Sequence, residues 1–153
     1  MKIIPKIVLE EDYMIEMILK PVGIIHSPFK EKKDSPHQGR FATELSEIEI
    51  FKEYKLAMDG IEKYTNLIVL YWLDKSERDL LKVIPKGSTE KGNVVKKGVF
   101  ATRAPSRPNP IAFNVVDLLD VNQNKLKVKG LEALDGSFLV DIKPYWKDID
   151  CVD

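Results

Sequence analysis

Hydrophobic and polar residues alternate along much of this chain, a pattern typical of β-strands that bury one face. The clearest alternation spans residues 125–131 and begins Lys-Leu-Lys-Val-Lys. Residues 67–73 instead form an unbroken run, Leu-Ile-Val-Leu-Tyr-Trp-Leu, with polar residues on either side. Seven residues of this kind are typical of a strand that is buried on both faces. Both patterns predict a protein built mainly from β-sheet.

Shorter segments predict the remaining elements. Four of them are rich in aliphatic or aromatic residues and lie next to proline or glycine turn signals, and they predict strands at 19–26, 98–102, 111–119 and 138–142. The segment 111–119 fits a strand with or without a bulge. Residues 44–50 alternate only in part and fit a strand or a short helix. Residues 51–58 carry apolar side chains at helical spacing, and Gly60 would end that helix.

The polar segments 30–40 and 85–97 are predicted to be loops. Six or so strands with one or two short helices predict a mostly-β fold, either a barrel or a sandwich. No linker rich in glycine, serine or proline divides the chain. We therefore expect a single domain at 18–147, with an N-terminal extension at 1–17 and a C-terminal tail at 148–153.

The charge balance narrows the classes of function. The 153 residues contain 24 basic and 24 acidic side chains, so the formal net charge is zero, while 44% of residues are hydrophobic. This composition supports a folded domain and argues against a broad basic surface for nucleic acid. Local patches remain possible, because charges cluster: 30–33, 86–97 and 103–107 are basic, whereas 44–53 and 148–153 are acidic.

Cysteine and histidine are scarce. Cys151 is the one cysteine, and His26 and His37 are the two histidines, so we expect no disulfide framework and no metal site. No apolar run approaches the roughly 20 residues that a membrane helix needs, and no signal peptide is recognisable. A cytoplasmic protein without a membrane segment is the expectation.

The most unusual segment is 103–110, where three prolines restrict the backbone around two arginines, Arg103 and Arg107. Rigidly held arginines suit a carboxylate or phosphate ligand, because preorganised donors lose less entropy on binding. The alternative is a stiff surface turn whose arginines cap carbonyl groups or pair with acids. The residues alone leave both interpretations open.

Two further segments are rich in hydrogen-bonding groups. Residues 35–40, Ser-Pro-His-Gln-Gly-Arg, place several donors in one loop, although most such loops are only solvated connections. Residues 134–137, Leu-Asp-Gly-Ser, form a turn signal that can present backbone groups to a ligand but is more often simply a turn. No glycine-rich phosphate loop, dinucleotide fingerprint or nucleophile elbow is present.

Four motifs resemble those of one known family, and they occur along the chain in the same order as in that family. They are Gly-Val-Phe-Ala-Thr-Arg-Ala-Pro-Ser-Arg-Pro-Asn-Pro-Ile at 98–111, Pro-Val-Gly-Ile-Ile-His-Ser-Pro-Phe at 21–29, Leu-Asp-Gly-Ser at 134–137 and Asp-Ile-Lys-Pro-Tyr at 141–145. Together they resemble the TsaA-like family, whose best-understood members are the tRNA-methyltransferase O enzymes. The resemblance covers about 19–146, most of the chain.

The resemblance implies a β-barrel-like fold, S-adenosyl-L-methionine as methyl donor, and a homodimer. It implies methylation of N6 of threonylcarbamoyladenosine beside the anticodon of tRNA, which would bind transiently through local basic patches. Two alternatives are a non-catalytic S-adenosylmethionine-binding sensor and a methyltransferase that acts on a small molecule or another RNA.

The resemblance also implies a set of site residues. Donor contacts are expected from Pro36, His37, Gln38, Leu73, Asp74, Arg103, Leu134, Asp135, Gly136 and Ser137. Arg107 and Arg40 are expected to bind substrate. A nitrogen that carries a carbonyl substituent is a poor nucleophile, so a general base is useful, and Asp135 and His37 are the candidates.

The chain departs from the family pattern at two places. Leu73 and Asp74 stand where relatives often carry an aromatic residue and histidine, and this difference keeps the sensor alternative open. Ala112, Phe113 and Asn114 replace the more usual Gly-Leu-Ser.

Overall fold

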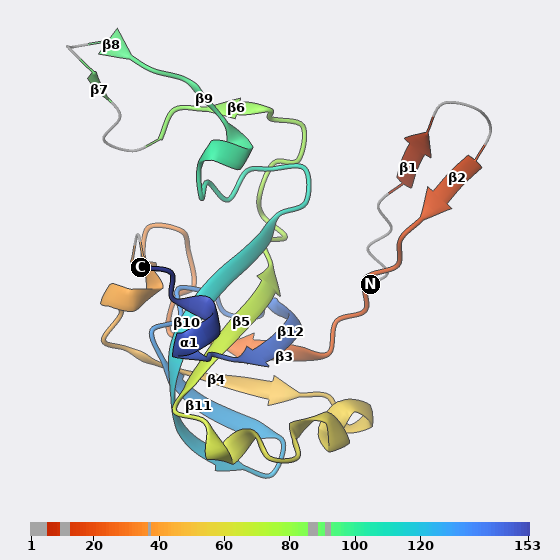
Figure 1. Cartoon of the computed structure of the whole chain (residues 1–153), viewed down its shortest axis with the longest axis vertical. Helices are drawn as coiled ribbons and strands as arrows, with labels where there is room; N and C mark the ends of the chain where they lie inside the picture. Colours follow the sequence, from red (N-terminus) through yellow and green to blue (C-terminus); the bar gives the residue numbers. More distant parts are fainter. Residues whose placement is uncertain (1–5, 10–12, 37, 86–88, 91–92) are drawn as a thin grey trace.

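The computed structural model describes residues 6–9, 13–36, 38–85, 89–90 and 93–153. Six strands close an antiparallel barrel in the order β10-β11-β4-β3-β12-β5 (Figure 1). Their bounds are β3 Gly23–His26, β4 Leu45–Ile50, β5 Asn66–Trp72, β10 Ile111–Asn122, β11 Lys125–Lys129 and β12 Phe138–Pro144. The predicted mostly-β, barrel-like fold is confirmed, and the sandwich is excluded.

Three small two-stranded sheets lie apart from the barrel (Figure 1). They pair β1 Lys6–Leu9 with β2 Tyr13–Glu16, β6 Lys82–Val83 with β9 Lys97–Gly98, and β7 Thr89–Glu90 with β8 Asn93–Val94. The helical segments are short: η1 Gly39–Phe41, η2 Lys52–Met58, η3 Ile61–Lys63 and η4 Val99–Ala101 are 3-10 helices, and α1 Lys147–Asp150 is an α-helix. Within the described residues, no helix is long and apolar enough to cross a membrane.

The barrel interior explains the hydrophobic patterns of the sequence. In β11, Leu126 and Val128 are fully buried while the lysines between them face outward, as the alternation predicts. In β5, three successive residues, Leu67, Ile68 and Val69, are buried, as expected for a strand covered on both faces. Burial of these side chains is the main favourable contribution to folding.

Strand β10 joins two neighbours along its length. It pairs with β5 over residues 111–117 and with β11 over residues 117–122, and the register shifts between Leu118 and Asp120. The predicted bulge is therefore present. Asn114 and Val116 are two residues apart on β10 and both buried, so a polar side chain enters the interior on the same face as a hydrophobic one.

The sequence prediction is wrong at 98–102. Strand β9 ends at Gly98, and η4 follows instead of a longer strand. The Thr102 backbone N–H and its hydroxyl both donate to the Val99 carbonyl, at 3.1 and 2.9 Å, and these local bonds close a turn in place of strand pairing. Phe100 is left 83% exposed.

Smaller differences concern element bounds and types. β3 begins at Gly23, later than predicted, although the Val22 amide already donates to the Leu139 carbonyl at 2.9 Å. The open choice at 44–50 is resolved as a strand, and the predicted helix at 51–58 is a 3-10 helix. The segment 85–97 contains the short β7 and β8 rather than loop alone.

Candidate functional site

A pocket of about 390 Å³ lies where η1, β10 and the loop after η4 meet, and we call it the Arg103 pocket. Its lining residues are Gln38, Gly39, Arg40, Asn66, Arg103, Phe113, Asn114, Val115 and Tyr145. Its volume falls within the range of small-molecule sites. Three of the residues singled out from the sequence, Gln38, Arg40 and Arg103, therefore meet in one place.

Gly39 allows the first loop to reach this pocket. A Cβ atom at Gly39 would lie 2.4 Å from the Gly130 carbonyl oxygen and 2.6 Å from Asn114 Nδ2, so a side chain does not fit. Gly130 itself has φ +95°, a left-handed conformation that suits glycine. The close contact between these two glycines fixes Gln38 and Arg40 against the end of β10.

Arg103 is held at the pocket wall by an aromatic side chain. Its guanidinium carbon lies 5.9 Å from the centroid of the Phe113 ring, the geometry of a cation–π contact. Phe113 is one of the positions where the chain departs from the family pattern. Because the ring positions the cation without neutralising it, Arg103 keeps its charge for an anionic ligand group.

A chain of buried hydrogen bonds lies behind the pocket. The Tyr71 hydroxyl donates to Asn114 Oδ1 at 2.9 Å, and Asn114 Nδ2 donates to Glu132 Oε1 at 3.3 Å. Burial raises the pKa of Glu132, while hydrogen bonds from Asn114 and the Gly39 amide, and the Arg103 charge, act in the opposite direction. Burial also raises the pKa of Tyr71, so its hydroxyl remains a neutral donor.

Tyr71 and Glu132 were not expected at the site from the sequence, and Asn114 stood out only as a departure from the family pattern. One signal was available for Glu132: an acidic residue stands between Leu131 and Ala133, which are both 1% exposed. A charged residue between two core residues needs polar partners, because an unpaired buried charge is costly.

A second pocket, of about 640 Å³, lies beside the end of β3 and is called the Asp135 pocket. It is lined by His26, Ser27, Pro28, Lys30, Leu45, Ser46, Glu47, Lys127 and Asp135. Asp135 accepts hydrogen bonds from Lys30 Nζ at 2.5 Å and from the Ser27 amide at 2.9 Å. These bonds lower the pKa of Asp135, so its carboxylate stays ionised and is a weaker proton acceptor than an ordinary aspartate.

The turn at 134–137 is fixed by its own backbone bonds. The Asp135 amide donates to the Phe29 carbonyl at 2.7 Å and the Gly136 amide to the Ile25 carbonyl at 2.8 Å. Ser137 closes the turn, since its hydroxyl donates to the Leu134 carbonyl at 2.7 Å. These amide groups are engaged within the protein, so a ligand would meet the side chains and carbonyl groups of the turn.

The two arginines of the proline-rich loop differ in their surroundings. Arg107 Nη1 donates to the carbonyl groups of Thr102 at 3.2 Å and Ala104 at 3.1 Å, so Arg107 holds the loop that carries Arg103. The Arg107 bonds agree with the structural interpretation of this loop, while Arg103 lines the pocket, and the ligand contacts expected of both arginines stay predictions. On η1, Arg40 lies 3.5 Å from Asp117 Oδ1.

The remaining expected donor contacts lie elsewhere. Leu73 follows β5 and its amide donates to the Pro110 carbonyl at 2.8 Å, while the neighbouring Asp74 is exposed. Neither residue lines either pocket. Pro36 is half-buried, and His37 lies outside the described residues.

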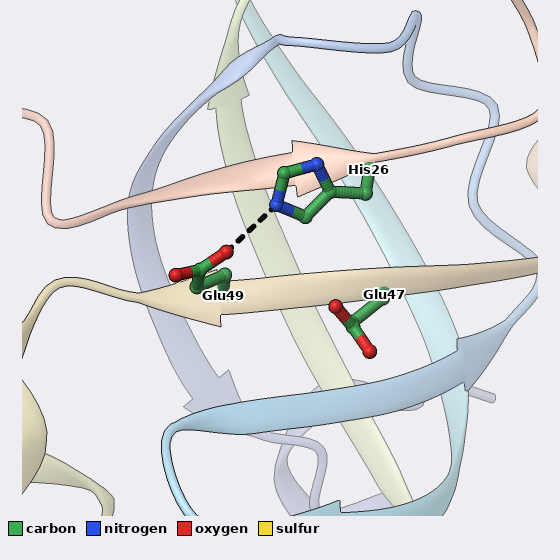
Figure 2. Close-up of side chains that lie close together, drawn as sticks. All are labelled: His26, Glu47 and Glu49. Atoms are coloured by element: carbon green, nitrogen blue, oxygen red, sulfur yellow. Dashed lines mark hydrogen bonds and ion pairs between the residues drawn. The ribbon is translucent and has the colours of Figure 1, made fainter.

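One cluster of side chains has the composition of a metal site. His26 on β3 and Glu47 and Glu49 on β4 share one face of the sheet, with their ligand atoms within 4.8 Å of one another (Figure 2). Histidine and carboxylate groups are suitable ligands for divalent cations. His26 Nε2, however, lies 2.8 Å from Glu49 Oε2, and Lys125 Nζ lies 2.7 Å from Glu47 Oε1. A hydrogen bond between His26 and Glu49 and an ion pair between Lys125 and Glu47 therefore account for the arrangement, and the absence of a metal stays a prediction.

Comparison with known proteins identifies the family of the chain. The profile of the tRNA-methyltransferase O N-terminal domain matches residues 24–151. An S-adenosyl-L-methionine-binding protein of Archaeoglobus fulgidus is 54% identical over 136 residues, which cover 89% of this chain and 94% of that protein. A tRNA (adenine(37)-N6)-methyltransferase of Escherichia coli is 34% identical over 131 residues, which cover 81% of this chain and 55% of that protein.

A crystal structure of TrmO from Pseudomonas aeruginosa has the same fold. It matches with a TM-score of 0.73 and 31% sequence identity, over 94% of this chain and 60% of that one. The chain thus spans little more than half the length of the Escherichia coli and Pseudomonas aeruginosa proteins, whereas it matches nearly the whole Archaeoglobus protein.

Proposed function

The chain belongs to the tRNA-methyltransferase O N-terminal domain family, and on this basis we propose that it is an S-adenosylmethionine-dependent methyltransferase. Its substrate in this proposal is the threonylcarbamoyladenosine beside the tRNA anticodon, which it methylates on N6. The observation that carries the proposal is the meeting of Gln38 and Arg103, from two motifs far apart in the sequence, in one pocket.

The Arg103 pocket has the chemistry that the methyl donor requires. Arg103 offers a guanidinium group to the carboxylate of the donor, and Gln38 offers amide hydrogen bonds. The Phe113 ring offers an apolar face to the adenine. When bound, the donor supplies an electrophilic methyl group on a positively charged sulfur.

The residues of the chain contribute mainly by orientation. A rigid loop fixed by Arg107 and a glycine contact at Gly39 hold the two sides of the pocket, so little freedom is lost when a ligand binds. Arg40 lies at the same pocket and is exposed, which suits a phosphate group of the RNA. The general base remains a choice between Asp135 and His37.

We also propose that tRNA binds through local basic patches and that the protein acts as a homodimer in the cytoplasm. The net charge of zero provides no broad attraction for nucleic acid, so tRNA affinity should be weak and strongly dependent on salt. The segment around β6 and β9 exposes large apolar side chains, Leu81, Ile84, Val94 and Phe100, which a second copy of the chain could cover.

Transfer of a labelled methyl group from S-adenosylmethionine tests the proposed reaction. We expect transfer to tRNA that carries threonylcarbamoyladenosine and none to the same tRNA without that modification. Donor binding without transfer would favour the sensor, an alternative supported by the residues at Leu73 and Asp74 and by the name of the Archaeoglobus relative. Transfer only to another RNA or a small molecule would retain the methyltransferase but overturn the substrate.

A further inference from the structure

We propose that Glu132 is a positioning residue of the donor site that joins the segments around Gln38, Arg103 and Leu134. This inference rests on the proposed function, because it concerns the same pocket. Glu132 does not itself line the Arg103 pocket, so it acts through the residues that do.

The first segment is bracketed by Glu132 at both ends. On one side of residues 36–38, the Ser35 hydroxyl donates to the Glu132 backbone carbonyl at 2.6 Å. On the other side, the Gly39 amide donates to the Glu132 carboxylate. One residue therefore fixes both ends of the stretch that carries Gln38 into the pocket.

The second segment, around Arg103, interacts with Glu132 through its charge and through a hydrogen bond from β10. The positive charge of Arg103 acts on the Glu132 carboxylate, and Asn114 on β10 donates to that carboxylate at 3.3 Å. Asn114 is in turn held by the Tyr71 hydroxyl on β5. The carboxylate thus attracts the arginine, which lines the pocket and lies over the Phe113 ring.

The third segment, the turn at 134–137, is connected to Glu132 by the backbone. Glu132 lies two residues before Leu134, and its neighbours Leu131 and Ala133 are anchored in the core. A movement of Glu132 is therefore transmitted to the turn at 134–137 as well as to the first loop. Three of the four donor-binding segments expected from the sequence are therefore linked to Glu132, and the fourth, Leu73 and Asp74, bonds the Pro110 carbonyl instead.

Among the groups of this arrangement, the Glu132 carboxyl group is the one that gains or loses a proton as the pH changes. The groups that face its carboxylate are the Gly39 amide of η1, Asn114 of β10, Arg103 of the loop between η4 and β10, and Tyr71 of β5. Arginine stays charged and this tyrosine stays neutral over the usual pH range. Burial raises the pKa of Glu132, so protonation weakens its contacts at a higher pH than for an ordinary glutamate.

Binding of S-adenosylmethionine, measured by calorimetry across pH, tests the inference. Glu132→Gln keeps the shape of the side chain but removes its charge, and we expect donor affinity to fall about tenfold at neutral pH. The wild-type affinity should weaken as the pH falls and that of Glu132→Gln should not. Glu132→Asp should recover part of the loss. Glu62→Gln, an exposed residue of η3, is the matched control and should bind as the wild type does.

The outcomes separate the two proposals. If the wild type binds no donor, the proposed function fails and the inference with it. If the wild type binds and Glu132→Gln binds equally well at every pH, the inference alone is overturned. Should Glu132→Gln fail to fold, Ser35→Ala removes one bracket of the first loop and leaves the buried charge in place. We expect this variant to weaken donor binding several-fold, and unchanged binding would overturn the inference.

Discussion

Arg103 lies over the ring of Phe113, 5.9 Å from its centroid, on the wall of a pocket that also contains Gln38. A second arginine has a similar contact at a different place: Arg78 lies 5.3 Å from the centroid of the Trp72 ring and outside the Arg103 pocket. Arg78 also donates to the Pro108 carbonyl at 2.8 Å, so it supports the loop that carries Arg103 without lining the pocket itself.

Arg103→Ala should weaken donor binding by about ten- to one-hundredfold, the effect of losing a hydrogen bond to a charged group. Arg78→Ala removes a cation–π contact outside the pocket together with the bonds of Arg78 to the Pro108 carbonyl and the Asn109 side chain, so it should weaken donor binding less than Arg103→Ala does. Calorimetry on both variants makes the comparison. Equal affinity of Arg103→Ala and the wild type would remove Arg103 from the site.

Gly39→Ala should destabilise the fold and impair the pocket together. The added Cβ would meet the Gly130 carbonyl at 2.4 Å, and backbone atoms at that position cannot move aside easily. We expect a loss of about 1–3 kcal/mol in the free energy of unfolding, typical of overpacking. Gly98→Ala is the control, since its φ is −58° and the nearest atom lies 4.0 Å away. Urea denaturation of both variants gives the difference, and similar stability would contradict the close packing of η1.

Asp135→Asn should reduce stability near neutral pH but not in acid. The Lys30 and Ser27 bonds lower the pKa of Asp135 in the folded protein, so its stabilisation is present above the ordinary aspartate pKa. It is lost as the pH falls through the lowered value and the carboxylate takes up a proton. We expect Tm to fall by no more than about 4 °C at pH 7, because solvent screens this partly exposed pair. The difference from the wild type should shrink below about pH 4. A constant difference across pH would show that the ion pair is not its source.

The same variant bears on the choice of general base. If Asp135 serves only to hold Lys30 and the Ser27 amide, Asp135→Asn should retain methyl transfer under conditions in which it is folded. A loss of transfer with unchanged donor binding would instead support Asp135 as the base. Single-turnover measurements with labelled donor distinguish these outcomes.

Local patterns were sufficient to predict most strands but not the closure of the sheet into a barrel. The alternation at 125–131 and the apolar run at 67–73 depend only on which faces are buried, so the sequence predicts them directly. Closure depends on pairs distant in the chain, such as β10 with β5, and the pattern alone did not distinguish a barrel from a sandwich. At 98–102 the Thr102 hydroxyl made the difference, because its bond to Val99 competes with strand pairing.

The candidate site, like the fold, could be predicted from the sequence only in part. Arg103 and Asp135 lie in motifs that resemble those of a known family, and the same resemblance assigned Gln38, in the loop 35–40, to the donor site. Their separation into two pockets, with Asp135 in the second, depends on side-chain packing that no spacing rule describes. The contact between Asn114 and Glu132 was missed for the same reason, since the two residues meet only through the register of the barrel.

The segment around β6 and β9 leads to a prediction about assembly. Phe100 is 83% exposed within the single chain, and Leu81, Ile84 and Val94 of the same part of the sequence are exposed as well. In the proposed homodimer this side chain is buried at the interface. Light scattering should therefore give about twice the 17.5 kDa of one chain. Phe100→Ser should weaken the dimer by about thirtyfold or more, as for a buried aromatic residue at an interface.

Leu56→Ser is the matched control for this prediction, because Leu56 is equally exposed, at 84%, but lies on η2. It should leave the dimer intact. Both side chains are exposed in the monomer, so neither substitution should change the stability of the barrel by much. A monomeric wild type would contradict the proposed homodimer. A dimer that Phe100→Ser leaves unchanged would place the interface on another face of the protein.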